Sequence, residues 1–383
     1  MKKLIALLLS LVLLLGMVAC SSNNNSGDAA NSNSGADSSG SSDSGSGGTY
    51  EITVNGVTYT TSVDPASVDL ACSVYQQDAH QSLLRQAAID CAEAYGVNLV
   101  STVTDSDAAK ELEFLSTCTS QGVDGYVWAP CGTATYAPLA EAAEAGTYIA
   151  IINGMPVSEG FEAPWELFSG NFYNSNESMC ATLGEVVKQP LSEVFADEIA
   201  AGETLKVGII AFDALSKETS DVRANATLDQ LTALGLKYEV VSRQDAVEQD
   251  KAIEVSTDML TANPDLDLFV SCCESASIGA IMTVANEGLE GSCYVTGIDV
   301  SVQIAKLMQE YPGIGLAFVG QSSYVSGWNA AQQVIRLCLG IEEETTAAQI
   351  GKENIQPDQI LDSTDPDGIQ AYIDEMAALG ITG

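Results

Sequence analysis

The sequence predicts an α/β fold of two similar lobes, each built around a parallel sheet. Apolar strand-like segments alternate with helical segments from Val68 to Ile152, and the same alternation restarts at Lys206. The strand-like segments are apolar throughout rather than at every second residue, which is typical of a parallel sheet covered on both faces. The body from Thr49 onward has about 335 residues, more than one ordinary core accommodates.

In the first half, apolar periodicity and glycine stops separate the elements. One helical face carries recurring apolar residues, namely Leu84, Ala88, Cys91 and Tyr95, and Gly96 ends that helix. Asp107 is a suitable N-cap for the helix that runs to Gln121. The expected strands span 68–74, 97–102, 125–129 and 148–152, and the expected helices span 80–95, 107–121 and 136–145.

The second half repeats this order. Its expected strands span 207–210, 237–241, 268–271 and 294–298, and its expected helices span 220–234, 250–260 and 275–286. The segment after Gly235 resembles the one after Gly96, since each leads through an apolar strand to a helix with inward residues and then to a buried strand. Two similar Rossmann-like units therefore form a bilobal chain built from a repeat.

Shorter segments flank the two units. Alternating strand-forming residues surround Asn55-Gly56, which predicts a β-hairpin with a type I′ turn within an N-terminal extension at 49–67. At the other end, 355–383 is a tail with one helix, 366–379. Asp365 is its expected cap and Gly380 its stop.

The N-terminus has the features of an export signal. Lys2 and Lys3 precede an apolar stretch of about a dozen residues, which small residues close at Cys20. The end of this 1–20 signal resembles a bacterial lipobox, in which the cysteine is acylated; a plain secretory signal cleaved near Ala19 is the alternative. The Ser/Asn/Gly-rich segment 21–48 has almost nothing to bury and is expected to be a disordered linker. We therefore expect a protein anchored by lipid at the extracytoplasmic face of a bacterial cell membrane.

The composition narrows the possible partners. A net charge of −38 repels phosphate backbones, which argues against nucleic-acid binding. Ten cysteines include Cys20 but no C-x-x-C pair, and His80 is the single histidine, so no metal site and no cofactor are expected. The odd number of other cysteines leaves their disulfide state open, and most are expected to serve as small apolar side chains. We expect a monomer.

Ordered pieces of the body carry a family resemblance. They include Gly122-Val-Asp-Gly-Tyr-Val-Trp-Ala-Pro130, Ile149-Ala-Ile-Ile-Asn153, Phe269-Val-Ser-Cys-Cys-Glu274, Val295-Thr-Gly-Ile-Asp299 and Phe318-Val-Gly-Gln321. In order and spacing, 68–339 resembles the type I periplasmic sugar-binding proteins, the solute receptors of ABC importers akin to ribose-binding protein. The resemblance implies a periplasmic binding protein-like type I fold, a monosaccharide or similar small polar ligand, and delivery to an ABC transporter permease.

The resemblance also implies where the lobes divide. Lobe 1 would comprise 68–168 and 322–344, and lobe 2 would comprise 169–321 and 345–383 with the C-terminal tail. The chain would cross between the lobes near Phe168, near Gln321 and near Leu339 to Glu344, and these crossings would form a hinge. The helix 324–339 would then pack on lobe 1 although it follows lobe 2.

Matching position by position gives the candidate ligand-binding residues. These are Asp78, His80, Gln81, Asn153, Arg223, Glu274, Asp299 and Gln321, all near expected strand ends or helix starts. In open α/β sheets the ligand lies beyond the carboxyl ends of the strands, where such side chains can satisfy the hydroxyls of a sugar. Several have simpler interpretations: His80 could merely begin its helix, and Gln321 could be a hinge residue.

Two further alternatives stay open. Asp299 could cap the helix that begins near Val302. Arg223 could form only an exposed ion pair with Asp221 or Glu218, and Asp221 is the residue that falls on the usual binding arginine of the family.

Other functions are also compatible with parts of the sequence. An exported hydrolase using two carboxylates is unlikely, because there is no G-x-S-x-G, P-loop or H-E-x-x-H motif. A sensory lipoprotein that presents a signal molecule to a kinase or chemoreceptor would need the same fold, so the sequence does not separate it from a transport receptor. The ligand itself stays open among monosaccharides, sugar alcohols, nucleosides and small polar signals.

Overall fold

A computed structural model describes residues 48–382 apart from 155–156, 159–160, 163–164 and 342. The first of its two large sheets has six parallel strands in the order β15-β9-β6-β5-β3-β4. These strands are β3 (Asp69–Val74), β4 (Asn98–Val103), β5 (Gly125–Trp128), β6 (Tyr148–Ile152), β9 (Gly170–Tyr173) and β15 (Glu353–Ile355). Two short strands, β7 (Val157–Ser158) and β8 (Phe161–Glu162), pair only with each other.

The second large sheet also has six strands, in the order β11-β10-β12-β13-β14-β16. The strands are β10 (Thr204–Ala211), β11 (Lys237–Asp245), β12 (Leu268–Ser271), β13 (Tyr294–Ile298), β14 (Gly315–Gly320) and β16 (Gln359–Asp362). All neighbours are parallel except the edge strand β16, which is antiparallel to β14. The predicted α/β fold with two similar, mostly parallel sheets is confirmed.

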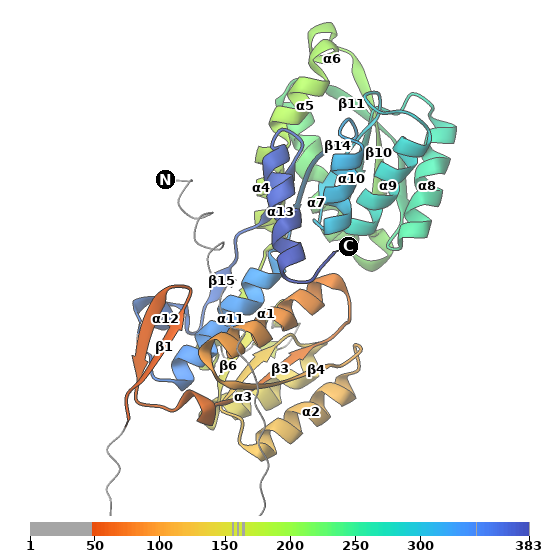
Figure 1. Cartoon of the computed structure of the whole chain (residues 1–383). Helices are drawn as coiled ribbons and strands as arrows, with labels where there is room; N and C mark the ends of the chain where they lie inside the picture. The colour runs from red at the N-terminus through yellow and green to blue at the C-terminus, as the bar shows by residue number, and fades with distance from the viewer. Residues whose placement is uncertain (1–47, 155–156, 159–160, 163–164, 342, 383) are drawn as a thin grey trace, which may run out of the picture. The chain divides into compact units, whose positions relative to one another are not determined.

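Helices cover both sheets (Figure 1). Those beside the first sheet are α1 (Ala79–Tyr95), α2 (Ala108–Gln121), α3 (Tyr136–Glu144), α11 (Ser323–Cys338) and α12 (Glu344–Gln349). Those beside the second are α4 (Asn176–Val186), α5 (Lys188–Val194), α6 (Ala196–Ala201), α7 (Asp213–Ala233), α8 (Gln249–Ala262), α9 (Glu274–Asn286), α10 (Val302–Glu310) and α13 (Pro366–Ala378). The helices between 176 and 201 were not expected from the sequence.

Each sheet carries a hydrophobic core on both faces, as the apolar strands predicted. Along β5, Tyr126 and Trp128 enter one core of the first sheet, while Val127 and the following Ala129 enter the other. Tyr126 and Trp128 are fully buried, so they pack in the core and offer no surface for a ligand. Cys91 packs with Leu84 and Tyr95 in the same core as Val127, as its position on the helical face predicted.

The cysteines behave mainly as small buried side chains. All nine that the structure describes are free, and six of them are buried. Cys20 and the predicted signal lie outside the described residues, as does nearly all of the predicted linker. None of the helices described is long and apolar enough to span a bilayer.

The chain passes between the two sheets three times, and two passages differ from those expected. The strand β9 belongs to the first sheet, so the first passage follows Tyr173 rather than Phe168. The strand β15 also belongs to the first sheet, so the last passage follows Ile355, and 345–355 stays with lobe 1. Both strands are short, and no apolar run marks them in the sequence, because β15 is mostly polar and β9 begins with Gly170 and Asn171. The middle passage, after Gly320, is where it was expected.

One buried side chain joins the three passages. Asn174 is 8% exposed, and its Nδ2 donates to the carbonyl oxygens of Gln356 and Pro357 and to Oδ1 of Asp358 at 3.0–3.1 Å. Its Oδ1 accepts from the main-chain N–H of Ser322 at 3.1 Å. Asn174 therefore holds the first, second and third passages together with a single amide group.

Helix α11 packs on the first sheet although it follows β14 of the second, as predicted. It lies beside α1 (Figure 1), and it also contacts β5, β6 and β9. The contact with α1 depends on Gly327, because a Cβ there would lie 2.3 Å from the carbonyl oxygen of Leu84. The two helix backbones therefore approach closely at this point.

The predicted hairpin is present as β1 (Tyr50–Val54) and β2 (Val57–Thr61), and Asn55 and Gly56 both have positive φ. It packs on the first lobe through Tyr59, whose ring stacks on Tyr95 with centroids 5.9 Å apart. The guanidinium carbon of Arg336 lies 4.9 Å from the centre of the Tyr59 ring, and Nη2 of Arg336 donates to its hydroxyl. The hairpin thus contacts both α1 and α11.

We expect Tyr59→Ala to lower the free energy of unfolding by about 3 kcal/mol, because it removes the stacked ring and the cation–π contact. Urea unfolding followed by circular dichroism measures this loss. Tyr59→Phe keeps the ring and is expected to cost only about 1 kcal/mol. Equal stability of Tyr59→Ala and the wild type would show that the hairpin is only an appendage.

Candidate functional site

A cavity of about 160 Å³ lies where the carboxyl ends of strands from the second sheet face the start of α1. In folds of this type the ligand lies beyond the carboxyl ends of the strands. Four of the eight candidate residues line the cavity, namely His80, Glu274, Asp299 and Gln321. Arg223 and Asn153 contact members of this group. The fold therefore brings six of the eight candidates together, four in the cavity wall and two in contact with it.

Asp299 follows β13 and is held in a left-handed conformation, with φ of 78°. Its Oδ2 lies 3.3 Å from Nη1 of Arg223, and both side chains are largely buried. Asp299 does not cap α10, because the side chain of Ser301 accepts from the N–H of Ile304 at that position. The carboxylate of Asp299 therefore remains directed at Arg223 and the cavity.

Arg223 projects from α7 and is fixed at several atoms. Its Nε donates to Oδ1 of Asn176 at 2.9 Å, and its Nη1 donates to the carbonyl oxygen of Cys272 at 2.9 Å. The guanidinium also lies 5.4 Å from the centre of the Phe212 ring. These contacts orient the cation toward Asp299 before any ligand binds.

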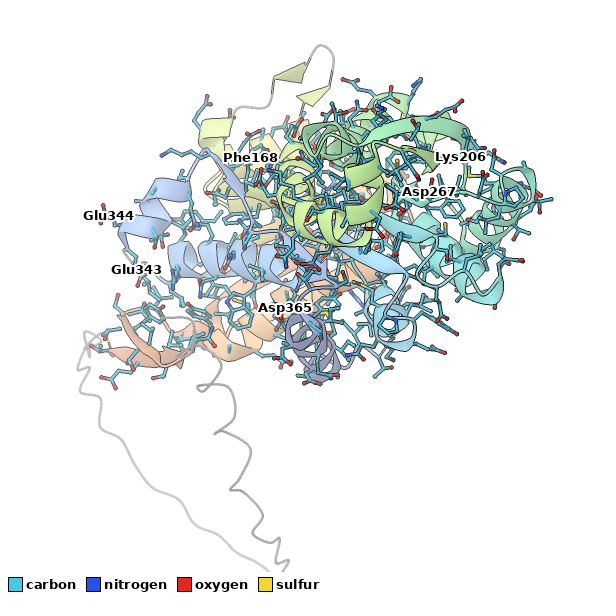
Figure 2. The ribbon with its side chains drawn as sticks, turned by 90° about the horizontal axis from the view of Figure 1, so that it is seen from above. Phe168, Lys206, Asp267, Glu343, Glu344 and Asp365 are labelled. Carbon is cyan, nitrogen blue, oxygen red and sulfur yellow. The ribbon has the colours of Figure 1, made fainter. Side chains whose placement is uncertain are left out.

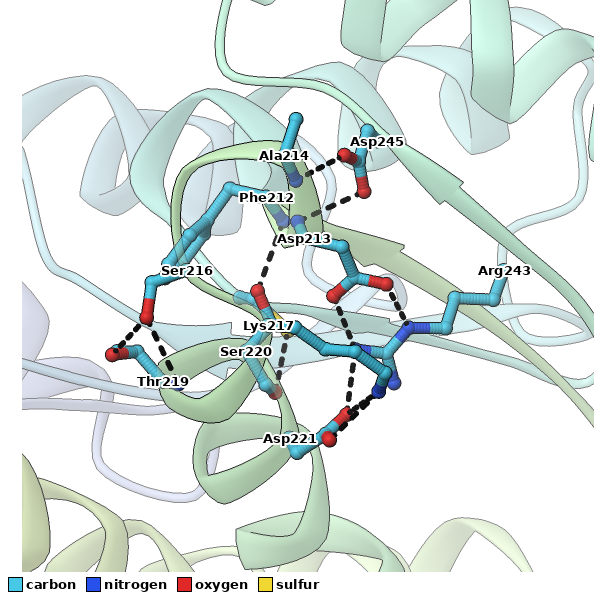
Figure 3. Close-up of polar contacts among 11 residues, drawn as sticks. Phe212, Asp213, Ala214, Ser216, Lys217, Thr219, Ser220, Asp221, Arg243 and Asp245 are labelled. Carbon is cyan, nitrogen blue, oxygen red and sulfur yellow. Dashed lines mark hydrogen bonds and ion pairs between the residues drawn. The ribbon is translucent and has the colours of Figure 1, made fainter.

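Asp221 has a different environment, which resolves the choice between the two residues of α7. Figure 3 shows Asp221 with Lys217 and Arg243; its carboxylate oxygens lie 2.7 Å from Nζ of Lys217 and 2.8 Å from Nη2 of Arg243. Arg243 also binds Asp213, and these partners lower the pKa values of both carboxyl groups. Asp221 is therefore part of an exposed ion-pair network, whereas Arg223 pairs with Asp299, which lines the cavity.

His80 lies in the first turn of α1 and joins two elements. Its Nδ1 lies 2.6 Å from Oγ of Ser323, at the start of α11. Its Nε2 is enclosed and has no hydrogen-bond partner at normal distance within the part of the chain that the structure describes. Burial lowers the pKa of the imidazole, while Asn153, Asp78 and Asp299 act in the opposite direction. The ring is therefore neutral at pH 7.

The pKa of His80 can be read directly, because the chain has a single histidine. We expect the imidazole of the ligand-free protein to titrate below 6.5 in a pH series of long-range ¹H–¹⁵N NMR spectra. A lowered pKa in the folded state favours the neutral ring, so this contribution to stability is present above 6.5 and decreases as the pH falls. A pKa at or above 6.5 would contradict the buried position.

Two candidates near His80, Asp78 and Gln81, lie outside the cavity wall. Asp78 is exposed, and its Oδ1 accepts from the N–H of Gln81 at 2.7 Å as the N-cap of α1. Gln81 is fully buried, and both polar atoms of its side chain lack partners. Neither residue lines the cavity. Asp78 therefore has a structural role without a ligand, whereas the amide of Gln81 is left unsatisfied.

Asn153 follows β6 with a positive φ of 47°, and its Nδ2 donates to the hydroxyl of Tyr75 at 3.0 Å. Burial and the nearby Asp78 raise the pKa of that hydroxyl, so Tyr75 remains protonated. Asn153 thus extends the polar groups around His80 toward the first sheet.

Glu274 and Gln321 complete the predicted set. Glu274 is the first residue of α9, and burial raises its pKa, as do Asp299 and Asp78, while a hydrogen bond with Ser301 lowers it. Gln321 follows β14, at the middle passage between the sheets. Gln321 therefore lies both in the segment that connects the two sheets and in the wall of the cavity.

The sequence missed the part of the cavity wall that comes from α13. Tyr372, Glu375 and Met376 line the cavity from this C-terminal helix. The cap Asp365 (Figure 2) and the stop at Gly380 were predicted, and both are confirmed. No local pattern indicates where a helix packs, so only the tertiary structure shows that α13 reaches the cavity.

A second hollow lies at the opposite edge of the first sheet. It is larger, at about 430 Å³, and is lined mainly by small or apolar residues, including Gly122, Gly146 and Tyr148. These residues precede or begin strands, which is the edge where ligands of open α/β sheets are not found. No group of three or more potential metal ligands occurs among the described residues.

Comparison with known proteins gives concordant matches. The family model described as "Periplasmic binding protein domain" matches residues 70–342. The "ABC transporter periplasmic-binding protein YphF" of Escherichia coli K12 is 22% identical over 231 residues, which cover 59% of this chain and 67% of that protein.

Solved structures share the fold at low identity. A periplasmic solute-binding protein of an ABC transporter from Actinobacillus succinogenes, with bound D-allose, is similar with a TM-score of 0.61 and 18% identity over 80% of this chain and 100% of the other. One from Bacillus halodurans, with bound myo-inositol, has a TM-score of 0.58 and 15% identity over 82% and 99% of the two chains.

Proposed function

Because the chain belongs to the periplasmic binding protein family, we propose that it captures a small polyhydroxy solute in the cavity beside Asp299 and delivers it to an ABC import permease. The observation that carries this proposal is the buried pair of Asp299 and Arg223 at the carboxyl ends of the strands, next to His80 and Gln321. The family consists of non-enzymatic solute-binding proteins of ABC transporters, so the prediction that the protein is not an enzyme is confirmed.

The chemistry of the cavity supports a ligand rich in hydroxyl groups. A hydroxyl both donates and accepts, and the cavity wall offers carboxylate acceptors and an amide that does both, while the guanidinium of Arg223 pairs with Asp299 of that wall. Leaving such groups unpaired in a closed site is costly, which gives selectivity for hydroxylated solutes over apolar ones. The relatives with bound D-allose and myo-inositol support a monosaccharide or a sugar alcohol.

The N-terminal sequence supports a location outside the cytoplasm. We infer that residues 1–20 direct export, that Cys20 carries lipid, and that 21–48 tethers a monomeric body to the membrane. A single acyl chain holds a protein only weakly, so stable anchoring depends on the several chains of a lipoprotein. Cys20→Ala is expected to release the protein into the medium or the periplasm.

A thermal-shift screen tests the proposed function. A true ligand at 100 times its dissociation constant stabilises the folded state by about 2.7 kcal/mol, which is easily detected as a rise in melting temperature. The set comprises aldohexoses, aldopentoses, inositols and linear sugar alcohols, with nucleosides as a separate class. Stabilisation by a polyol or sugar supports the proposal; stabilisation by none of them contradicts it.

We also propose that binding closes the two lobes about the three passages that Asn174 joins. Small-angle scattering should show a smaller radius of gyration with ligand than without it. Asn174→Ala removes the hydrogen bonds that hold the three passages together, so the passages are less ordered without ligand. Closure must then order them at a cost in entropy, and the affinity for the ligand should fall by about tenfold. Asn98→Ala, which removes exposed hydrogen bonds far from the passages, is the control and should not change affinity. Unchanged scattering with a confirmed ligand would contradict the motion.

A further inference from the structure

The cavity has an unbalanced charge. Glu274, Asp299 and Glu375 line it, and no lysine or arginine does. Arg223 pairs with Asp299 from behind. No described lysine or arginine forms an ion pair with Glu274 or Glu375. The imidazole of His80 is neutral at pH 7, so it adds no positive charge. Two carboxylates therefore remain without a counter-charge.

These two carboxylates share the cavity wall with an aromatic ring, because Tyr372 also lines the cavity. Burial raises the pKa of the Tyr372 hydroxyl, and Glu274 and Glu375 act in the same direction. Tyr372 comes from α13 and Glu274 from α9, so the arrangement exists only in the folded protein. A cavity wall that combines an aromatic ring with carboxyl groups is an environment that attracts an organic cation.

The unbalanced charge is not the only feature of this cavity that points to a ligand. The enclosed Nε2 of His80, which also lines the cavity, has no hydrogen-bond partner at normal distance among the described residues. An unsatisfied buried polar atom costs free energy unless a ligand or water pairs with it. Val300, Val302 and Met376 add apolar surface that suits the C–H groups of a ring. The cavity thus offers polar, apolar and anionic surfaces together.

We propose that the solute carries a protonated amine on its polyhydroxy frame, and that Glu274 and Glu375 bind this amine beside Tyr372. Asp299, Arg223 and Gln321 then bind the hydroxyl groups, so this inference rests on the proposed function. A neutral sugar leaves the two carboxyl groups of the cavity wall without a counter-charge. An amino sugar neutralises part of this charge, which distinguishes it from its neutral parent.

Matched pairs of ligands test the amine. Glucosamine and glucose, galactosamine and galactose, and mannosamine and mannose each differ by one amine in place of one hydroxyl. Calorimetry at pH 7 and low salt measures the affinity of the wild type for all six compounds. We expect the amino member of the preferred pair to bind at least tenfold more tightly than its parent, with a difference that shrinks at high salt.

Substitutions of the two glutamates test whether they bind the amine of the solute. Glu375→Gln should weaken the amino sugar by about fivefold and leave the neutral parent unchanged, because Glu375 lies at the exposed side of the cavity. Glu274→Gln should have a larger effect in the same direction. Asp374→Asn, which removes the adjacent exposed carboxylate of α13, is the matched control and should change neither affinity.

The outcomes separate the two proposals. Neutral sugars that bind as tightly as their amino counterparts, or more tightly, overturn the amine while leaving the solute-binding function intact. Tighter binding of amino sugars that Glu274→Gln and Glu375→Gln leave unchanged overturns the assigned position. Absence of binding by all six compounds, together with a negative polyol screen, overturns both.

Discussion

Asp299→Asn is expected to weaken ligand binding by about 100-fold without unfolding the protein. The carboxylate is the charged acceptor that faces the cavity, and it also pairs with Arg223 at 3.3 Å. Removing its charge leaves the largely buried guanidinium without a counter-ion and removes the acceptor for a ligand hydroxyl. Isothermal calorimetry with the solute found in the screen measures the effect.

The choice of asparagine keeps the backbone intact. Asp299 has φ of 78°, a conformation that asparagine adopts more readily than other residues with a side chain. Asp265→Asn is the control, because Asp265 is exposed and pairs only with Lys206 at the surface. The control should bind like the wild type. Affinity of Asp299→Asn within threefold of the wild type would mean that the solute binds elsewhere.

Gly327→Ala is expected to lower the free energy of unfolding by about 3 kcal/mol or more. The added methyl group would lie 2.3 Å from the main-chain oxygen of Leu84, so α1 and α11 must separate. Since α11 also packs on β5, β6 and β9, it cannot move away without disturbing the first sheet. Urea unfolding of the ligand-free protein measures the loss.

Whether Gly327→Ala destabilises or stabilises the protein distinguishes a close helix contact from an ordinary exposed helix position. In an exposed helix the same substitution stabilises by up to about 1 kcal/mol, because alanine favours the helix more than glycine does. Gly184→Ala in α4 is the matched control, since the one close contact of its new methyl group would be the flexible side chain of Gln230 at 3.0 Å, with the main-chain oxygen of Ala226 at an ordinary 3.5 Å. Gly184→Ala should be nearly neutral. A stabilised Gly327→Ala protein would refute the close approach of the two helices.

Much of the fold was predictable because apolar runs and caps are local signals. The strands β5 and β6 are apolar throughout, and Asp107 and Asp365 cap the helices as predicted. The strands β9 and β15 were missed because each is short and lacks an apolar run. Their pairing depends on Gly170, where a Cβ would lie 2.7 Å from Nδ2 of Asn354, and such a contact has no local pattern in the sequence.

In the candidate site, too, residues with a local sequence signal were predicted and residues that depend on tertiary packing were missed. Asp299 and Gln321 directly follow strands, so the rule of strand carboxyl ends located them, and both line the cavity. Asp78 was included for its position alone, whereas its carboxylate caps α1. Tyr372 and Glu375 were missed because they reach the cavity through the packing of α13 on α10, which depends on the whole fold.

The most direct test is a crystal structure of the protein with the solute that gives the largest thermal shift. We predict density for this solute in the cavity, with a hydroxyl on Asp299, another group on Gln321 or His80, and the amine beside Tyr372. Density in the hollow near Gly146 and Tyr148, with the first cavity lacking solute, would contradict the proposed binding site.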